Sequence, residues 1–203
     1  MNSRDKVLRS VFDLMISRGD DGLSVNDMLR ELNMTKGGFY YYFKSRDQLM
    51  CEIVRGCMMD MIIRPLEDAV KTDDGSLPVR DTLRMYYCLL PKKEDESAER
   101  CNVRNYFFLL FEMLEKYPEL RNLYREYYMK HMMALRDTVD RGIRQNGVIK
   151  CADAYGCAEM MMSARSGILA LNIIYGDTDL KIRLERSFDT IWNEITCRGG
   201  INE

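Results

Sequence analysis

Apolar residues recur at helical spacing along most of this 203-residue sequence, and this periodicity limits the fold more than any other feature. Runs in which apolar and polar residues alternate, as strands would require, are scarce. Proline, which interrupts helices, occurs only at positions 65, 78, 91 and 118. The sequence therefore predicts an all-α protein of about nine helices.

The first helix carries an apolar stripe, made of Val7, Leu8, Val11, Phe12, Met15 and Ile16. Ser24 is a favoured N-cap residue for a second helix, and Asn33 can adopt the left-handed conformation that ends it. Thr35 then caps a very short third helix. Ser45 caps a long fourth helix, in which Pro65 is expected to cause a kink or a break.

Five further helices are predicted in the rest of the chain. They are expected between Pro78 and Pro91, around Tyr106 to Leu114, for nearly thirty residues from Pro118, from about Ala152 to Tyr175, and from about Thr178 to Cys197.

Composition narrows the class of protein. No run approaches the roughly 18 apolar residues of a membrane span, and charges in the first apolar stretch disfavour a secretory signal. The seven cysteines are odd in number and form no CxxC pair, which favours a reducing cytoplasm over a disulfide framework or a metal site. We expect a cytoplasmic protein without metal, cofactor or membrane contact. The net charge of −2 means that nucleic-acid binding would need a local basic patch.

The segment MTKGGFYYYFKSRDQL, residues 34–49, combines adjacent glycines, three tyrosines and interleaved cations. With the second helix it forms a helix, a tight turn and a short helix, which is the layout of a helix-turn-helix reader. The capped start at Thr35 and Lys36 suits a phosphate. Gly37 and Gly38 permit close approach to DNA, although each costs roughly 1 kcal/mol in a helix.

The aromatic residues of this segment divide between the core and the surface. Phe39 and Phe43 are four residues apart and are expected to hold the short helix onto the core. Tyr40, Tyr41 and Tyr42 cannot all point inward, so at least two hydroxyls should face solvent or a ligand. Lys44 and Arg46 follow as phosphate contacts. The alternative is an aromatic core segment with incidental surface lysines.

Residues 24–49 resemble the N-terminal DNA-binding domain of TetR-family transcriptional regulators. The family pattern reads here as T-K-G-G-F-Y-Y-Y-F-K-S-R, followed by Asp47 and Leu49. Ser24 stands where Thr is commonest and Arg46 where Lys is usual. Leu29, Leu32 and Asn33 replace small residues of the family pattern, and this difference bears on how the two helices pack.

The resemblance implies roles for individual residues. Thr35, Tyr40, Tyr42 and Lys44 would hold phosphates, whereas Lys36, Gly38 and Tyr41 would lie nearest the bases. Lys36 is the residue expected to read guanine directly. Ser24 and Arg46 would grip the DNA backbone from two helix N-termini. For Tyr40 the alternative is a core tyrosine.

The resemblance also implies a division into two domains, a helix-turn-helix DNA-binding domain (residues 1–48) and an effector-binding and dimerisation domain (residues 49–203). The last two helices are expected to form a four-helix bundle with those of a second chain. The residues assigned to this interface are Ala158, Ala164, Gly167, Leu184, Phe188, Ile191 and Ile195. The alternative is that this helix pair only closes the core of the monomer.

The middle of the chain is rich in methionine and aromatic residues, which suit an adaptable apolar cavity. The resemblance implies an effector pocket there, lined by Met61, Tyr86, Tyr106, Phe107, Phe111, Tyr124, Tyr127, His131 and Arg165. Each of these residues also fits an ordinary core. His131 would be a satisfied core residue or a ligand contact, and Arg165 would pair with an anionic effector or make a structural ion pair.

The sequence therefore predicts a homodimeric regulator, most simply a repressor, that releases a palindromic DNA operator when a small, largely apolar effector binds. Catalysis has little support, because one histidine and no GxSxG, HExxH or phosphate-loop motif leave few candidate groups. Two alternatives stay open. One is a thiol-based redox sensor using the repeated CxxxxxC spacing of Cys51–Cys57 and Cys151–Cys157; the other is a helical binding module without DNA function.

Overall fold

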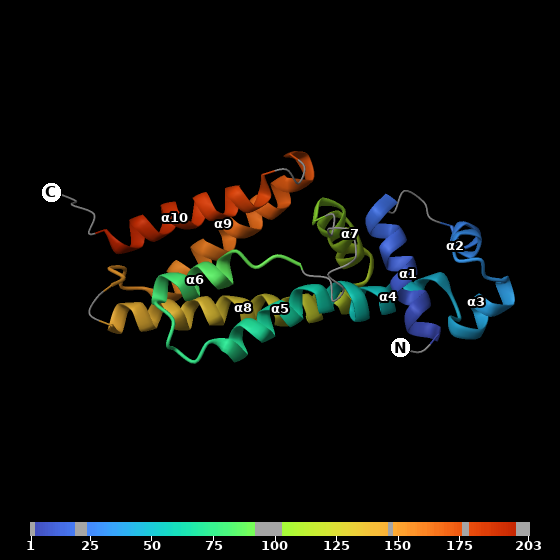
Figure 1. Ribbon diagram of the computed structural model, residues 1–203, viewed down its shortest axis with the longest axis horizontal. Coiled ribbons are helices and arrows are strands. Elements are labelled where there is room, and N and C mark those ends of the chain that lie inside the picture. The colour runs from blue at the N-terminus through green and yellow to red at the C-terminus, as the bar shows by residue number, and fades with distance from the viewer. Residues whose placement is uncertain (1–2, 19–23, 92–102, 146–147, 176–178, 198–203) are drawn as a thin grey trace. The chain divides into compact units, whose positions relative to one another are not determined.

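The computed structural model describes residues 3–18, 24–91, 103–145, 148–175 and 179–197, and within these ranges every regular element is helical. The elements in chain order are α1 (Ser3–Arg18), α2 (Val25–Glu31), α3 (Lys36–Tyr42), α4 (Arg46–Ile53), the π-helical turn η1 (Val54–Met58), α5 (Met59–Thr72), α6 (Val79–Tyr87), α7 (Val103–Lys116), α8 (Pro118–Arg144), α9 (Ala154–Tyr175) and α10 (Leu180–Thr196) (Figure 1). The all-α prediction is confirmed, and each predicted helix is present.

The predicted fourth helix is interrupted, but not at the proline. Helix α5 continues through Pro65 to Thr72, so the prediction of a break at Pro65 is wrong. The irregular segment is η1, where the Met59 N–H donates to the Val54 carbonyl in the wider π pattern. The Tyr106 hydroxyl donates to the Met58 carbonyl over 2.9 Å, so a side chain from α7 supports the end of this turn.

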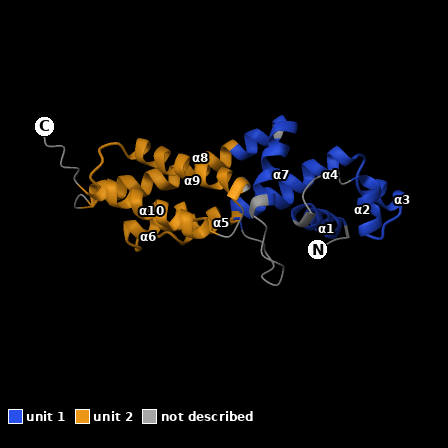
Figure 2. Cartoon of the chain, turned by 90° about the horizontal axis from the view of Figure 1, so that it is seen from above, with its two compact units in different colours: residues 1–63, 91–124 blue, residues 64–90, 125–203 orange. Residues whose placement is uncertain are grey.

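Packing divides the chain into two compact units, residues 1–63 with 91–124 and residues 64–90 with 125–203 (Figure 2). Unit 1 holds α1 to η1, the start of α5, α7 and the start of α8. Unit 2 holds the rest of α5, α6, most of α8, α9 and α10. The boundary expected at residue 48 does not coincide with this division and stays a prediction.

The core of unit 1 is built on α1. Its predicted apolar stripe is buried from Leu8 to Ile16, and α1 packs against α4, η1 and α7. The Asn105 side-chain amide donates to the Ile16 carbonyl over 2.7 Å and so holds α7 to the end of α1. Helices α1, α4 and α7 therefore form the frame of unit 1 together with η1.

Unit 2 is organised around the pair α9 and α10, and both of these helices pack against α6. Leu184 and Phe188 are fully buried on α10, as are Ala158 and Met161 on α9. On the surface, Arg80 and Arg84 of α6 pair with Asp189 and Glu185 of α10 at 2.7 and 2.6 Å. None of the helices within the described residues is long and apolar enough to cross a membrane.

Candidate nucleic-acid interface

Three helix caps fix the geometry of α2, α3 and α4. The Ser24 hydroxyl accepts from the Asp27 N–H at 3.2 Å, and the Asp27 carboxylate accepts from the Ser24 N–H at 3.1 Å. Thr35 accepts from the Gly38 N–H and Ser45 from the Gln48 N–H, each at 3.1 Å. Because a cap satisfies amides that a helix start leaves unpaired, all three predicted helix starts are confirmed. The hydrogen bonds from Ser24 lower the pKa of the Asp27 carboxyl group, so Asp27 accepts them as a carboxylate at neutral pH.

The turn between α2 and α3 depends on one left-handed residue. Asn33 has a φ of 49°, a conformation that Asn adopts more readily than most residues. The Met34 N–H then donates to the Leu29 carbonyl at 2.9 Å and closes the turn. Leu29, Leu32 and Asn33 are thus compatible with a tight helix-turn-helix.

Two phenylalanines anchor α3 and determine which side chains it exposes. Phe39 and Phe43 are both completely buried, with ring centroids 5.6 Å apart. With these positions facing inward, Tyr40 is 48 % exposed and Tyr41 is 83 % exposed. Tyr42 is half-buried and packs edge-on against Tyr41. The prediction that at least two tyrosines face outward is confirmed for Tyr40 and Tyr41, and the buried alternative for Tyr40 does not hold.

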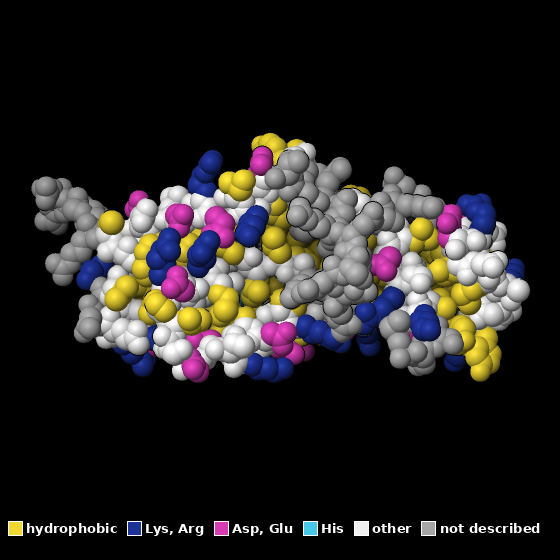
Figure 3. Space-filling model, in the orientation of Figure 1, with side chains coloured by type: hydrophobic (Ala, Val, Ile, Leu, Met, Phe, Trp, Pro, Cys, Tyr) yellow, Lys and Arg dark blue, Asp and Glu magenta, His cyan; other side chains and the backbone are white. Residues whose placement is uncertain are grey.

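The cations and glycines of the segment lie on the surface of unit 1. Lys36 and Lys44 are exposed, and Arg46 is half-buried. A Cβ at Gly37 would meet no atom within 4 Å, whereas one at Gly38 would lie 3.3 Å from the Thr35 hydroxyl oxygen. Figure 3 shows Lys and Arg side chains at the α2–α3 end of the unit. Side chains that can contact phosphate or base edges therefore surround the exposed side of α3.

Tyr117 has a role at this site that sequence reasoning missed. Its hydroxyl donates to the Asp47 carboxylate over 2.8 Å, and the Lys116 ammonium lies 3.5 Å from the same oxygen. These contacts lower the pKa of Asp47, with the Tyr117 hydrogen bond as the larger cause. The first turn of α4, beside Arg46, is thus tied to the end of α7. No local signal marks a contact between residues 70 positions apart.

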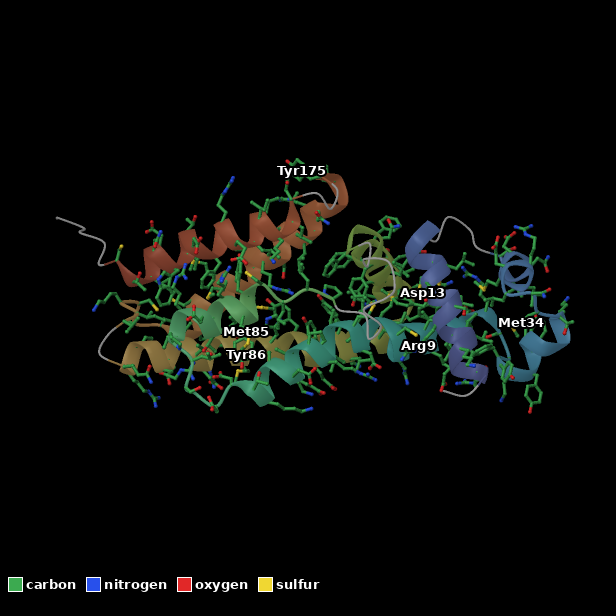
Figure 4. All side chains as sticks on the ribbon, viewed as in Figure 1. Arg9, Asp13, Met34, Met85, Tyr86 and Tyr175 are labelled. Carbon is green, nitrogen blue, oxygen red and sulfur yellow. The ribbon has the colours of Figure 1, made fainter. Side chains whose placement is uncertain are left out.

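The residues assigned to an effector pocket are divided between the units. Met61, Tyr106 and Phe107 are buried in unit 1, where Tyr124 is half-buried and Phe111 is 43 % exposed. Tyr86, Tyr127, His131 and Arg165 lie together in unit 2 and are all buried; Figure 4 marks Tyr86 on α6.

His131 is fully buried and both of its ring nitrogens have partners. Nε2 lies 2.7 Å from the Tyr86 carbonyl, which can only accept, so Nε2 carries the proton. Nδ1 lies 3.3 Å from the Tyr127 hydroxyl. Burial, and then the nearby Arg165 charge, lower the pKa of His131 to about 3. His131 is therefore a neutral histidine within a hydrogen-bonded core.

Arg165 is a buried cation that is held by carbonyl groups. Its Nε donates to the Tyr87 carbonyl at 3.0 Å and its Nη2 to the Leu89 carbonyl at 2.5 Å. Burial raises the pKa of the nearby Tyr127 hydroxyl, and the Arg165 charge acts against this rise. Together with His131 it satisfies the carbonyls at the C-terminal end of α6, where a helix leaves acceptors unpaired and favours positive charge. The contact is structural, but it is not the ion pair that the sequence suggested.

A surface groove of about 570 Å³ lies on α6 and α10 and is lined by Arg84, Lys181, Ile182, Glu185, Arg186, Asp189, Thr190 and Asn193. None of these residues belongs to the predicted effector set. Basic and acidic side chains alternate on this face (Figure 3), so it does not resemble the apolar cavity that was predicted. Within the described residues, no cluster of three or more His, Cys, Asp or Glu side chains could hold a metal ion.

The residues assigned to a dimer interface fall into two groups. Ala158, Leu184, Phe188 and Ile195 are buried within unit 2, and Ala164 and Ile191 are half-buried. Gly167 is exposed, and a Cβ placed there would meet nothing within 4 Å. Apolar residues Met160, Leu171 and Ile174 are exposed on the same helix, the last of them by 75 %.

Comparison with known proteins agrees with this geometry. Residues 8–53 match the family model of "bacterial regulatory proteins, tetR family". An uncharacterised HTH-type transcriptional regulator from Lactococcus lactis is 36 % identical over 53 residues, covering 26 % of this chain and 27 % of that protein. The negative regulator IcaR of the biofilm operon icaADBC, from Staphylococcus epidermidis, is 23 % identical over 73 residues, covering 34 % of this chain and 40 % of IcaR. The chain thus spans less than half the length of either relative.

Solved structures extend the similarity of fold to nearly the whole chain. A TetR-family regulator from Marinobacter aquaeolei superposes with a TM-score of 0.70 at 18 % identity, over 97 % of this chain and 92 % of the other. The capped α2–turn–α3 unit with its exposed aromatic and basic side chains is a helix-turn-helix DNA-binding domain of a transcriptional regulator. The family match covers residues 8–53, and nearly the whole chain shares its fold with solved TetR-family regulators.

Proposed function

We propose that this protein is a cytoplasmic, non-enzymatic repressor that binds a palindromic operator as a homodimer and releases it when a small, largely apolar effector binds. The observation that carries the DNA-binding part is the arrangement of α3. Two buried phenylalanines fix the helix, while Tyr40, Tyr41 and Lys36 remain at the surface. Exposed aromatic groups of this size are costly to leave in water without a partner, and the adjacent cations suit DNA phosphates.

Within this proposal Lys36 reads base edges and Lys44 binds phosphate. Selection from random duplexes should return a palindrome, with affinity that falls steeply as salt rises because phosphate contacts release counterions. Lys36→Ala should flatten discrimination between sites, and Lys44→Ala should weaken all sites alike. Lys130→Ala, an exposed cation on α8, serves as the matched control and should do neither. Selection that enriches no sequence would refute DNA reading by α3.

The proposed dimer uses the exposed stripe of α9. Met160, Ala164, Gly167, Leu171 and Ile174 are spaced by four, three, four and three residues, so they share one helix face. Ala158, Leu184, Phe188 and Ile195 would support this surface from inside unit 2. Gly167→Glu should give monomers that lose operator binding, because two α3 helices on one face of DNA require twofold symmetry. A wild-type monomer at micromolar concentration in light scattering would exclude this dimer.

Repression is included because IcaR, to which 73 residues of this chain are similar, is a negative regulator. The effector is supported only by the buried methionine and aromatic side chains of the middle helices, since such side chains suit apolar ligands. An effector that favours one spacing of the α3 helices by roughly 1–3 kcal/mol would change operator affinity about 5- to 150-fold. A true effector should both raise the melting temperature and release the operator. Stabilisation without release would show a pocket uncoupled from DNA.

A further inference from the structure

The two CxxxxxC segments of this chain differ in geometry. Cys51 lies in α4 and Cys57 in η1, so both belong to one continuous helical run. Residues six apart on a helix are separated by about 9 Å along the axis and by roughly 120° around it, and such thiols cannot meet. Cys151 instead precedes α9, and Cys157 lies in the first turn of that helix. Only the second pair can approach through a turn of the chain.

Asp153 provides that turn. Its carbonyl accepts from the Cys157 N–H at 3.1 Å, and its carboxylate accepts from the Gly156 N–H at 3.0 Å. The Cys151 thiol contacts the same Asp153 carbonyl at 3.8 Å. The Cys151 thiol and the Cys157 N–H therefore contact the same carbonyl oxygen. The start of α9 thus holds two free cysteines around one turn of the chain.

The segment that precedes this thiol pair is anchored to two helices. The Lys150 N–H donates to the Ile195 carbonyl of α10 at 2.7 Å, and the Ile149 N–H donates to the Gly142 carbonyl of α8 at 3.2 Å. Cys157 is only 8 % exposed, whereas Cys151 is half-buried. Burial, and then the nearby Cys151 thiol, raise the pKa of Cys157 to about 12, so Cys157 keeps its proton. Cys151 is therefore the member of the pair that solvent and an oxidant reach.

We propose that Cys151 and Cys157 form a reversible intrachain disulfide when the protein meets a peroxide. The Cys151 sulfur, after losing its proton to solvent, attacks one peroxide oxygen, and the O–O bond breaks to give a sulfenic acid and hydroxide, which takes up a proton as water. The Cys157 sulfur then attacks the Cys151 sulfur, and the sulfenic hydroxyl leaves with the Cys157 proton as a second water. Two thiols and one peroxide thus become one disulfide and two waters. A dithiol reductant reverses the change by thiol–disulfide exchange.

This inference does not depend on the proposed function, and it can be tested on the full chain without DNA. Native protein is treated with hydrogen peroxide, the remaining thiols are alkylated without reduction, and proteolytic peptides are analysed by mass spectrometry. The expected result is a linked pair of peptides containing Cys151 and Cys157, the loss of two titratable thiols per chain, and recovery of both with dithiothreitol. Thiol loss without this linked pair, or no thiol loss at all, would overturn the proposal.

Single variants assign the two roles. In Cys157→Ser, Cys151 should stop as a sulfenic acid that dimedone traps, and in Cys151→Ser no disulfide should form. The double variant Cys51→Ser/Cys57→Ser has the same sequence spacing and is the matched control, which should retain the full loss of two thiols. If Cys157→Ser folds poorly, Cys157→Ala preserves the apolar site and gives the same test. Equal oxidation of Cys51 and Cys57 in the wild type would show general reactivity and would also overturn the proposal.

Discussion

Helix α3 in unit 1 and the polar cluster of Tyr127, His131 and Arg165 in unit 2 use similar side chains in opposite ways. On α3 the aromatic and basic side chains at Lys36, Tyr40 and Tyr41 stand at the surface. In unit 2 the tyrosine, the histidine and the arginine are buried and bonded to one another or to the end of α6. A buried polar group must find its hydrogen-bond partners within the fold. Exposed polar and aromatic side chains remain available to a binding partner.

This difference sets what each region can do. The cluster in unit 2 contributes to stability, because the loss of one member leaves buried acceptors or donors without partners. The surface of α3 contributes little to stability beyond Phe39 and Phe43. Substitutions in the unit 2 cluster should therefore change the free energy of unfolding. Substitutions on the exposed surface of α3 should instead change operator binding.

The largest expected effect is at Arg165. Arg165→Met removes the donors to the Tyr87 and Leu89 carbonyls, and each buried unsatisfied group costs about 1–3 kcal/mol. We expect the free energy of unfolding in urea to fall by about 3 kcal/mol or more. Lys130→Met, at an exposed position of α8, should change it by less than about 0.5 kcal/mol. If the two variants had the same free energy of unfolding, Arg165 would not stabilise the fold, and a role as a ligand contact would be favoured.

The second effect depends on pH and is expected at His131. Its pKa is about 3 in the folded chain against an ordinary 6.5, so between these values the unfolded chain binds more protons. The stability contributed by neutral His131 is complete above about pH 6.5 and is lost as pH falls toward 3, by up to about 1.4 kcal/mol per pH unit.

His131→Gln removes this titration while keeping a polar side chain. The variant should be less stable than wild type near neutral pH, but its free energy of unfolding should fall less between about pH 6.5 and about pH 5. Urea denaturation at several pH values measures both slopes. Parallel slopes for wild type and variant would mean that His131 already carries a proton in the fold, contrary to its two partners.

The caps and the turn of the helix-turn-helix could be predicted because they depend on neighbouring residues. Ser24, Thr35 and Ser45 each bind an amide three positions away, and Asn33 adopts the left-handed turn by its own preference. The division between buried Phe39 and exposed Tyr41 follows from helical period alone. Local chemistry therefore defined the proposed DNA-binding surface from the sequence.

Features that depend on packing between distant segments were not predictable. The Asp47–Tyr117 bond and the capping of α6 by Arg165 join residues more than 65 positions apart. The π turn at residues 54–58 has no local signal comparable with Pro65, which the helix tolerates. Likewise, periodicity shows that Leu184 and Phe188 share an apolar face, but it cannot show whether that face is buried by the same chain or by a second one.

The smallest expected effect comes from adding one methyl group to a glycine of α3 or of η1. Gly37 lies in α3 and Gly56 in η1, and a Cβ at either position would meet no protein atom within 4 Å. Because alanine is the better helix former, Gly37→Ala and Gly56→Ala should each raise the free energy of unfolding by up to about 1 kcal/mol.

The two glycine variants should differ in operator binding. The methyl group at position 37 occupies the proposed DNA-facing surface and should weaken binding despite the gain in stability, whereas Gly56→Ala should leave operator affinity unchanged. Chemical denaturation and fluorescence-anisotropy titration of one labelled operator measure the two quantities. If Gly37→Ala bound as tightly as wild type, close approach of α3 to DNA would not be the reason for this glycine.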